Sequence, residues 1–293
     1  MPRSGGRLQP VGAVIGLWVV LCLTGGCCST PKPPLDTDAL ISPERLDRGY
    51  TLLLPGIFGN TANDHELLVG LGGANLPSAI EMYDWTEGPW LMVYNLRGLN
   101  RNRREARKIA EKIVAYQDRY PGRPVHLVGY SGGGGVAVLA LEALPPGRRV
   151  TSAILLGATL APDYDLRLAM SHTEQGIRNF YSPADAPVLV ALMTVVGTTE
   201  GRHTGAAGAR GFTVPKGLEG DEREAYERGL IQQKHNREMF ALGNEGGHFG
   251  WLQPAFVQQW LAPLVTPPLT ASTQPVSYDQ SGADRGRRAE VFP

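Results

Sequence analysis

The glycine-rich run Gly129-Tyr130-Ser131-Gly132-Gly133 carries the clearest chemical signal in this sequence, because it fits the pattern G-x-S-x-G. It follows an apolar, strand-like segment at residues 125–128 and opens an apolar, helix-like segment at residues 134–144. A serine at such a strand–turn–helix junction sits in a strained turn that presents its hydroxyl for nucleophilic attack. Glycine two positions before and after the serine removes side chains that would collide in so sharp a turn. The pattern therefore predicts Ser131 as a nucleophile.

Other sites built on glycine-rich turns fit this sequence less well. No Lys-Ser or Lys-Thr pair follows the run, as in a phosphate-binding loop, and no G-x-G-x-x-G follows the strand, as in a dinucleotide site. No group of His, Cys and Asp residues has the spacing of a metal site. Lys plus Arg and Asp plus Glu number 28 each, so the sequence lacks the basic excess typical of nucleic-acid binding. We expect no cofactor, no metal and no nucleic-acid partner; a plain turn remains the alternative at Ser131.

The predicted elements around the serine alternate between strand and helix. Short apolar runs indicate strands, and amphipathic or apolar stretches that end at Pro-Gly or Pro-Pro indicate helices. The predicted strands cover residues 50–54, 79–85, 125–129, 152–156 and 177–181, and the predicted helices cover residues 101–120, 132–144 and 256–264. Such alternation favours an α/β fold with a mostly parallel sheet flanked by helices on both faces.

With the G-x-S-x-G junction set in this alternation, the chain resembles the esterases and lipases of the α/β-hydrolase family over residues 50–264. The resemblance implies a serine hydrolase that cleaves small-molecule or lipid carboxylic esters through an acyl-enzyme. It also implies a nucleophile, an acid and a histidine in that order along the chain. A peptidase, an amidase or an acyltransferase would use the same residues, and a non-catalytic binding protein would share the fold.

The resemblance implies a general base shortly before the last helix, and His248 stands there, in the loop at residues 244–250. A serine hydroxyl is a poor nucleophile unless such a base takes its proton. The glycines of this loop leave it free to bring the imidazole over the serine. An ordinary surface histidine is the alternative. The rival histidines fit less well, because they precede the serine, lie in a strand or lie in polar segments without a closing helix: His65, His126, His203 and His235.

The same resemblance implies an acid that orients the histidine from a position after a strand. Asp185 follows the predicted strand at residues 177–181, and flanking prolines would stiffen the turn that presents its carboxylate. Asp163 and Asp165, which follow the preceding strand, remain the alternatives.

The segment Pro55-Gly56-Ile57-Phe58-Gly59 follows the first predicted strand, where the resemblance implies a backbone donor to the oxyanion. Pro55 replaces a histidine that many relatives carry, which leaves a backbone donor intact. By position, the N–H of Ile57 would donate together with the N–H of Gly132 (oxyanion hole: Ile57, Gly132), and Phe58 is the alternative to Ile57. A plain strand-ending turn is the other interpretation.

The N-terminal segment has the composition of an export signal. Arg3 and Arg7 precede an apolar run at residues 11–23, which suits a secretory signal and is short for a membrane-spanning helix. Small residues then lead to Cys27, in a pattern similar to the bacterial lipoprotein signals in which the cysteine becomes acylated. We expect an exported protein of the cell envelope, anchored to a membrane by a lipid on Cys27. Cleavage without acylation and an uncleaved N-terminal anchor are the alternatives.

The composition of the chain predicts four segments. We expect a leader at residues 1–27, a tether at 28–49, one catalytic domain at 50–265 and a disordered tail at 266–293. The catalytic domain contains no cysteine, so its core rather than disulfides must hold it together.

The polar, glycine-rich stretch at residues 60–77 is a candidate entrance or lid. Trp85, Trp90 and Tyr94 follow it, and the sequence assigns them no role, because aromatic residues at such spacing more often belong to a core.

Overall fold

The computed structural model describes residues 36–189 and 197–266. The predicted export signal with Cys27, the first part of the tether and all but the first residue of the predicted tail lie outside the described residues. Part of the predicted tether is ordered: η1 (Asp38–Ile41) and α2 (Pro43–Leu46) bury the side chains of Leu40 and Leu46. Among the described residues, regular structure therefore begins at Asp38, within the predicted tether, rather than near residue 50.

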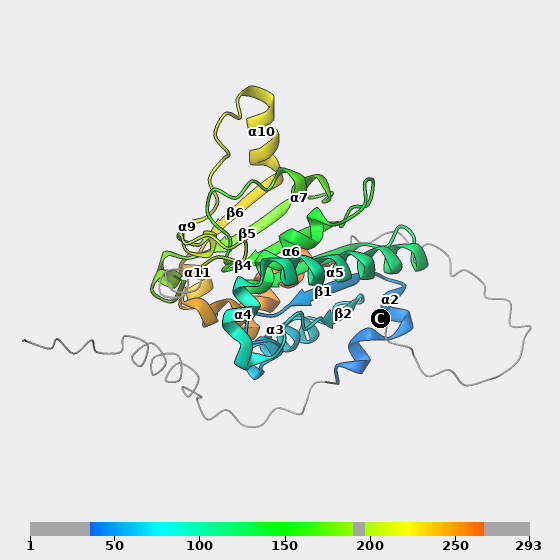
Figure 1. The fold of residues 1–293 in the computed structure, drawn as a ribbon. Coiled ribbons are helices and arrows are strands. Elements are labelled where there is room, and N and C mark those ends of the chain that lie inside the picture. Colours follow the sequence, from blue (N-terminus) through cyan, green and yellow to red (C-terminus); the bar gives the residue numbers. More distant parts are fainter. Residues whose placement is uncertain (1–35, 190–196, 267–293) are drawn as a thin grey trace, which may run out of the picture. The chain divides into compact units, whose positions relative to one another are not determined.

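Six parallel strands form the sheet, in the spatial order β2-β1-β3-β4-β5-β6 (Figure 1). The strands are β1 (Tyr50–Leu54), β2 (Ala79–Met82), β3 (Val125–Tyr130), β4 (Ser152–Leu156), β5 (Ile177–Tyr181) and β6 (Leu230–Lys234). Strand β1 comes first along the chain and pairs with β2 on one side and with β3 on the other. Strands β4, β5 and β6 then follow β3 in sequence order towards that edge of the sheet. The predicted α/β class with a parallel sheet is confirmed.

The helices that cover the sheet begin and end as follows. They are α3 (Ala62–Gly73), η2 (Pro89–Leu91), α4 (Met92–Arg97), α5 (Leu99–Arg119), α6 (Gly132–Glu142), α7 (Arg167–Ser171), η3 (Pro183–Asp185), α9 (Ala207–Arg210), α10 (Gly220–Gly229), α11 (Arg237–Phe240), η4 (His248–Leu252), α12 (Pro254–Phe256), η5 (Val257–Leu261) and η6 (Ala262–Leu264). The predicted closing helix at residues 256–264 is thus a series of α-, π- and 3₁₀-helical turns.

One face of the sheet packs against α5 and α6, which lie side by side (Figure 1). Side chains along a strand alternate between two faces. Leu52 and Leu127 are paired in register on neighbouring strands, and they share a buried core with Ile109 of α5 and Val138 of α6.

The opposite face packs against the C-terminal helices. Val128 and Ile154 are paired in register and point to this face. Ile154 is in turn paired with Arg178, so Phe180, two residues after Arg178 on the same strand, points to this face as well. The ring of Phe180 meets those of Phe256 and Trp260 edge-on, with centroids 5.8 and 6.5 Å apart. Helix α3 packs beside these turns, so both faces of the sheet are covered, as the nearly continuous burial of the central strands requires.

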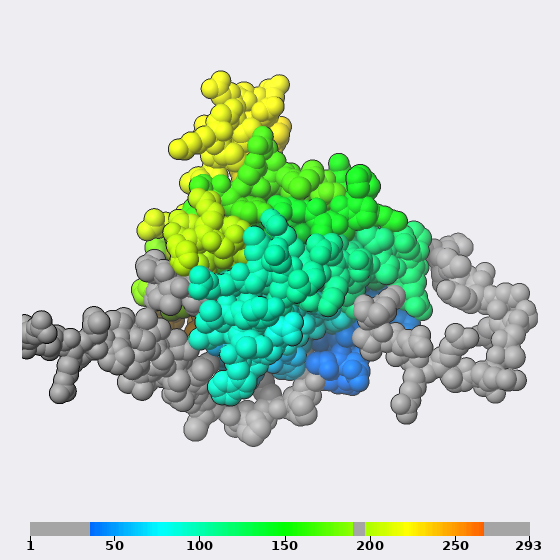
Figure 2. All heavy atoms as spheres, in the orientation of Figure 1, coloured from blue at the N-terminus to red at the C-terminus, as the bar shows by residue number. Residues whose placement is uncertain are grey.

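Three elements differ from what the sequence predicts. Strand β2 ends at Met82 rather than at residue 85. Residues 62–73, expected within an entrance or lid, form helix α3, with Leu67 and Leu71 buried. Strand β6 is an additional edge strand, in which Leu230 is the one buried residue. The following Ile231-Gln232-Gln233-Lys234 is exposed or half-buried and lacks the apolar run that identified the central strands. Figure 2 shows α10, in yellow, projecting from this side of the described residues.

Candidate active site

Ser131 occupies a strained turn between β3 and α6. Its backbone angles, φ 53° and ψ −118°, lie in a region that residues with a side chain rarely adopt. The surroundings hold this conformation, because the Ser131 N–H donates to the carbonyl of Leu156 at 2.9 Å and its carbonyl accepts from the N–H groups of Gly134 and Thr159. The strand–turn–helix setting predicted for the serine is therefore present in the structure.

The two glycines that flank the serine are required by close backbone contacts. A Cβ on Gly129 would lie 2.5 Å from the carbonyl oxygen of Gly133, and a Cβ on Gly133 would overlap the carbonyl oxygens of Leu54 and Pro55. These obstacles are backbone atoms that cannot rotate away. Only glycine lets the turn approach the end of β1, which carries the predicted oxyanion segment.

The structure brings together the three predicted catalytic side chains. The Ser131 Oγ lies 2.9 Å from His248 Nε2, and His248 Nδ1 lies 2.9 Å from each carboxylate oxygen of Asp185. With the proton on Nδ1, the imidazole donates to Asp185 and its Nε2 accepts from the serine hydroxyl. All three are buried, with 3% of Ser131, 0% of Asp185 and 8% of His248 exposed. The arrangement can take a proton from Ser131 and hold the resulting imidazolium beside a carboxylate.

Separate elements position these side chains. Asp185 ends η3, directly after β5, and its N–H donates to the carbonyl of Ser182. His248 begins η4, and the loop before it is held in place rather than free, because the Gly246 N–H donates to the side chain of the buried Asn244.

Tyr130, the variable residue of the G-x-S-x-G pattern, also contacts His248. Its buried hydroxyl donates to the His248 carbonyl at 3.2 Å, and the two rings are stacked at a tilt with centroids 5.1 Å apart. Burial, with smaller contributions from the carboxylates of Asp64 and Asp185, holds the pKa of the Tyr130 hydroxyl well above its ordinary value. The hydroxyl therefore stays protonated and can keep donating to the histidine backbone.

The structure separates the rival acids from this site. Asp163 forms an exposed ion pair with Arg202, which lowers its pKa, and Asp165 forms an exposed ion pair with Arg167, which also lowers its pKa. Neither carboxylate contacts a histidine among the described residues.

Two of the rival histidines likewise have other partners. His126 Nδ1 lies 2.8 Å from Ser152 Oγ, and His235 Nε2 lies 2.7 Å from the carbonyl of Asn244. Burial lowers the pKa of His126 to about 4, so its ring is neutral at physiological pH. These are structural contacts within the sheet and within the loop that carries His248.

The predicted oxyanion segment lies directly beside Gly132. A Cβ placed on Gly132 would collide with the side chain of Ile57, which is itself buried. Among the described residues, no hydrogen bond is donated by the N–H of Ile57, Phe58 or Gly132. These N–H groups are thus available to a bound oxyanion, and the geometry leaves both Ile57 and Phe58 as candidates for the second donor.

Hydrogen bonds hold three successive peptide groups of this segment, and side chains that the sequence left without a role make them at the first and the third. At the Pro55–Gly56 peptide, Trp85 Nε1 donates to the carbonyl at 2.7 Å and the N–H donates to Asp64 Oδ1 at 2.9 Å. At the next peptide, the Gly56 carbonyl accepts from the N–H of Gly59. Each carbonyl is therefore fixed, which orients the N–H at the opposite end of its peptide plane.

Asn95 holds the third peptide. Its side-chain amide donates to the carbonyl of Ile57 at 2.9 Å and to that of Gly88 at 3.0 Å, and its Oδ1 accepts from the N–H of Glu87 at 3.0 Å. Asn95 is completely buried. Because the Ile57 carbonyl and the Phe58 N–H belong to one peptide group, Asn95 sets the direction of that N–H.

Asp64 is buried at the start of α3, where Thr61 and Gly56 donate to its two oxygens. Burial raises the pKa of Asp64 above its ordinary value, and the hydrogen bonds oppose that shift. Thr61 and Asp64 fit the helix-start pattern [ST]-x-x-[DE], which predicts the start of α3 but not the contact between Asp64 and Gly56. Asn95 belongs to no sequence motif, because its partners are backbone groups, one of them 38 residues away in the chain.

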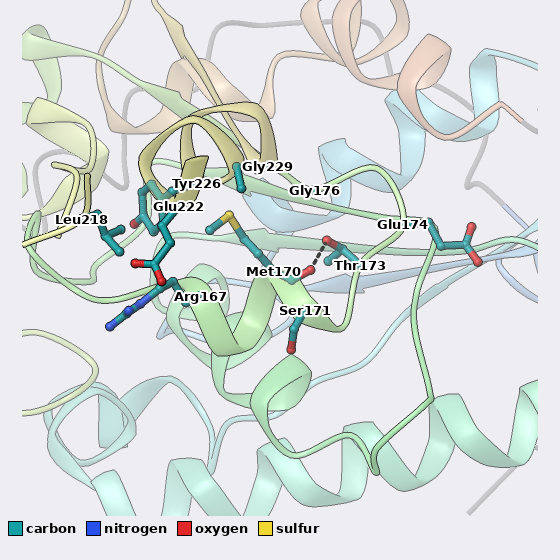
Figure 3. A pocket seen from close by; sticks show the side chains of 11 residues that line it. Arg167, Met170, Ser171, Thr173, Glu174, Gly176, Leu218, Glu222, Tyr226 and Gly229 are labelled. Atoms are coloured by element: carbon teal, nitrogen blue, oxygen red, sulfur yellow. Dashed lines mark hydrogen bonds between the residues drawn. The ribbon is translucent and has the colours of Figure 1, made fainter. Parts of the chain in front are cut away.

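A cavity of about 430 Å³ lies elsewhere, between α7 and α10 (Figure 3). Met170, Leu218 and Tyr226 line it together with Arg167 and Glu222, and none of the three predicted catalytic residues does. Within residues 36–189 and 197–266, no group of three or more His, Cys, Asp or Glu side chains is placed to hold a metal ion. No helix in these ranges is long and apolar enough to cross a membrane.

Comparison with known proteins adds a family match. A family model described as alpha/beta hydrolase fold matches residues 52–199, about half of the chain. No curated protein sequence matches the chain.

Several solved structures resemble the chain at low identity. Lipase B of Aspergillus fumigatus is 12% identical with a TM-score of 0.43, over 75% of this chain and 52% of its own, so the chain spans about half of that lipase. A lipase-esterase related protein from Clostridium acetobutylicum is 10% identical with a TM-score of 0.40, over 75% of this chain and 94% of its own. An acetylxylan esterase is 12% identical with a TM-score of 0.39, over 73% of this chain and 98% of its own. At these scores the likenesses bear on neither mechanism nor substrate.

Proposed function

This chain belongs to the α/β-hydrolase family, and from that premise we propose that it is a serine hydrolase that cleaves carboxylic esters. The observation that carries the proposal is the continuous set of contacts from Ser131 Oγ through the His248 ring to the Asp185 carboxylate, each 2.9 Å long. Three residues far apart in sequence meet at the spacing that proton transfer to and from a serine requires.

In the proposed reaction, Ser131 attacks the carbonyl carbon of the ester while His248 takes the hydroxyl proton. Asp185 keeps the imidazole in the required tautomer and stabilises its protonated form. The negative charge that develops on the carbonyl oxygen is bound by the N–H of Gly132 and by that of Ile57 or Phe58. His248 then protonates the leaving alcohol, and water, activated by the same histidine, hydrolyses the acyl-enzyme. An oxyanion donor of this kind contributes about 3–4 kcal/mol to the transition state.

The same constellation would serve a peptidase, an amidase or an acyltransferase, and the fold by itself would suit a non-catalytic binding protein. Hydrolysis of p-nitrophenyl esters of increasing acyl length, with matched anilides as amide controls, separates the esterase from a peptidase or amidase and from the binding protein. We expect the esters to turn over and the anilides to react far more slowly. Faster turnover of the anilides would indicate a peptidase or an amidase, and turnover of neither substrate by folded protein would favour the binding protein.

The location of the protein is a separate proposal. The apolar run at residues 11–23 and the small residues before Cys27 support export followed by acylation of that cysteine. Mass spectrometry of the mature N-terminus tests this. A terminus at Cys27 carrying acyl chains is expected. An unmodified terminus beyond Cys28 would reject the anchor and leave export standing.

A further inference from the structure

Four large apolar side chains are exposed together on η2 and α4. Trp90 is 96% exposed, Leu91 48%, Val93 44% and Tyr94 47%. Single exposed apolar residues are ordinary on protein surfaces, but four within five consecutive positions form a contiguous apolar feature. We call these four residues the Trp90 patch.

The exposure of the patch follows from how α4 is attached. The opposite side of this short helix is completely buried, since Asn95 and Leu96 are 0% exposed. Asn95 makes the three hydrogen bonds described above, to Ile57, Gly88 and Glu87. The buried side of α4 thus combines the polar contacts of Asn95 with the apolar side chain of Leu96, and Val93 and Tyr94 on the other side remain exposed to solvent without a described partner that covers them.

Cationic side chains adjoin the patch in the chain. Exposed arginines follow it at the end of α4 and on the first turns of α5: Arg97, Arg103, Arg104 and Arg107. Figures 1 and 2 show α4 and these first turns of α5 on the same face of the molecule. No described residue forms an ion pair or a hydrogen bond with these four guanidinium groups.

Nearby carboxylates neutralise only part of this charge, since Arg103 attracts the half-buried carboxylate of Glu142. Glu87 lies 3.5 Å from Arg101, which is buried, and Glu105 lies 2.9 Å from Lys108. Asp84 accepts hydrogen bonds from Thr86. The surface beside the patch therefore carries a net positive charge.

We propose that the Trp90 patch and the adjoining arginines dock the protein on an anionic lipid surface. Tryptophan and tyrosine favour the boundary between lipid headgroups and acyl chains, and leucine and valine favour the acyl region below it. Arginine adds attraction to anionic headgroups, worth about five-fold in binding for each charge at the surface. The combination of exposed aromatic, aliphatic and cationic side chains therefore matches the layered chemistry of an anionic lipid surface.

Docking would bring the lipid surface close to the reacting atoms. Val93 and Tyr94 of the patch lie on the same short helix as Asn95, which donates to the carbonyl of Ile57. The side chain of Ile57 lies against Gly132, the residue next to Ser131. The docked surface and the oxyanion segment would thus lie on opposite sides of α4. The docking itself does not depend on catalysis, so it can be measured in the absence of any substrate.

Quenching of tryptophan fluorescence by vesicles with brominated acyl chains tests the proposal on the full chain. Of the other tryptophans, Trp85 and Trp251 are fully buried, Trp260 is half-buried and Trp18 lies in the N-terminal apolar run. The difference in quenching between the wild type and Trp90→Phe therefore reports on the almost fully exposed Trp90. We expect mixed phosphatidylcholine–phosphatidylglycerol vesicles to quench the wild-type protein and to quench Trp90→Phe much less. Any contribution from an N-terminal anchor is common to both proteins.

Two further variants test the chemistry of the surface. Arg103→Gln combined with Arg104→Gln should weaken docking by about five-fold per charge, whereas Arg237→Gln, an exposed arginine on α11, should not. Phe240→Ala, which removes an exposed aromatic ring outside the patch, should leave quenching unchanged. Equal quenching of wild type and Trp90→Phe would overturn the proposal, as a patch that binds a protein partner would give that result. Equal docking on vesicles with and without phosphatidylglycerol would also overturn the proposal.

Discussion

The side-chain amide of Asn95 donates a 2.9 Å hydrogen bond to the carbonyl of Ile57 and thereby fixes a peptide group of the oxyanion segment. Asn95→Ala should lower kcat roughly ten-fold with little change in KM, because a misdirected donor loses part of the ~10²–10³-fold that a whole donor contributes. Steady-state kinetics on a soluble ester measures this. Asn100→Ala, an exposed asparagine on α5, is the matched control. A rise in KM with kcat unchanged would mean that Asn95 acts on substrate binding instead.

Gly133 should not tolerate a side chain. The Cβ of Gly133→Ala would overlap two backbone carbonyl oxygens at the end of β1, and neither can move without disturbing the sheet. We expect the free energy of unfolding to fall by about 1–3 kcal/mol, with a loss of activity in the molecules that remain folded. Urea unfolding measures the stability. Gly205→Ala, where the nearest atom lies 3.6 Å from the new Cβ, should be nearly neutral, and equal stability of the two variants would contradict the packing argument.

His126 should make stability depend on pH. Burial lowers its pKa to about 4 in the folded protein, against about 6.5 in an unfolded chain. Between these values the unfolded state binds more protons, so the free energy of unfolding decreases as the pH falls from about 6.5 to about 4, by at most roughly 3 kcal/mol. Urea unfolding at several pH values should show this slope in the wild type and a shallower one in His126→Gln. Equal slopes would show that His126 is not the responsible group.

The acid is tested by comparing three conservative changes. Asp185→Asn preserves shape but removes the charge that the His248 ring contacts at 2.9 Å, so kcat should fall by up to ~10⁴-fold. Asp163→Asn and Asp165→Asn remove exposed ion pairs and should retain near-full activity. Thermal melting establishes that each variant is folded. An active Asp185→Asn beside an inactive Asp163→Asn or Asp165→Asn would move the acid to the earlier strand.

Much of the fold was predictable, because the central strands are buried on both faces and appear in the sequence as short apolar runs. Strands β1, β4 and β5 have the predicted limits. Strand β6 has one buried residue and no apolar run, so the sequence does not predict it, and α3, which contains three glycines, was expected only as part of an entrance or lid. The ordering of η1 and α2 within the expected tether depends on the burial of Leu40 and Leu46, which composition alone does not reveal.

The candidate site likewise contains residues that the sequence predicts and residues that only the structure reveals. Ser131, His248 and Asp185 have side chains with their own chemistry and were found by motif and chain order. Asn95 and Asp64 act by binding backbone groups 38 and 8 residues away in sequence, and only the folded chain reveals such contacts.

The central claim is that Ser131 is a nucleophile activated by its contact with His248. Reaction of the folded protein with a fluorophosphonate, followed by mass spectrometry of the modified peptide, tests it most directly. We predict one adduct on Ser131, no adduct in Ser131→Ala, and strongly slowed labelling in His248→Ala. Labelling that is unchanged in Ser131→Ala, or that falls on a different serine, would contradict the account.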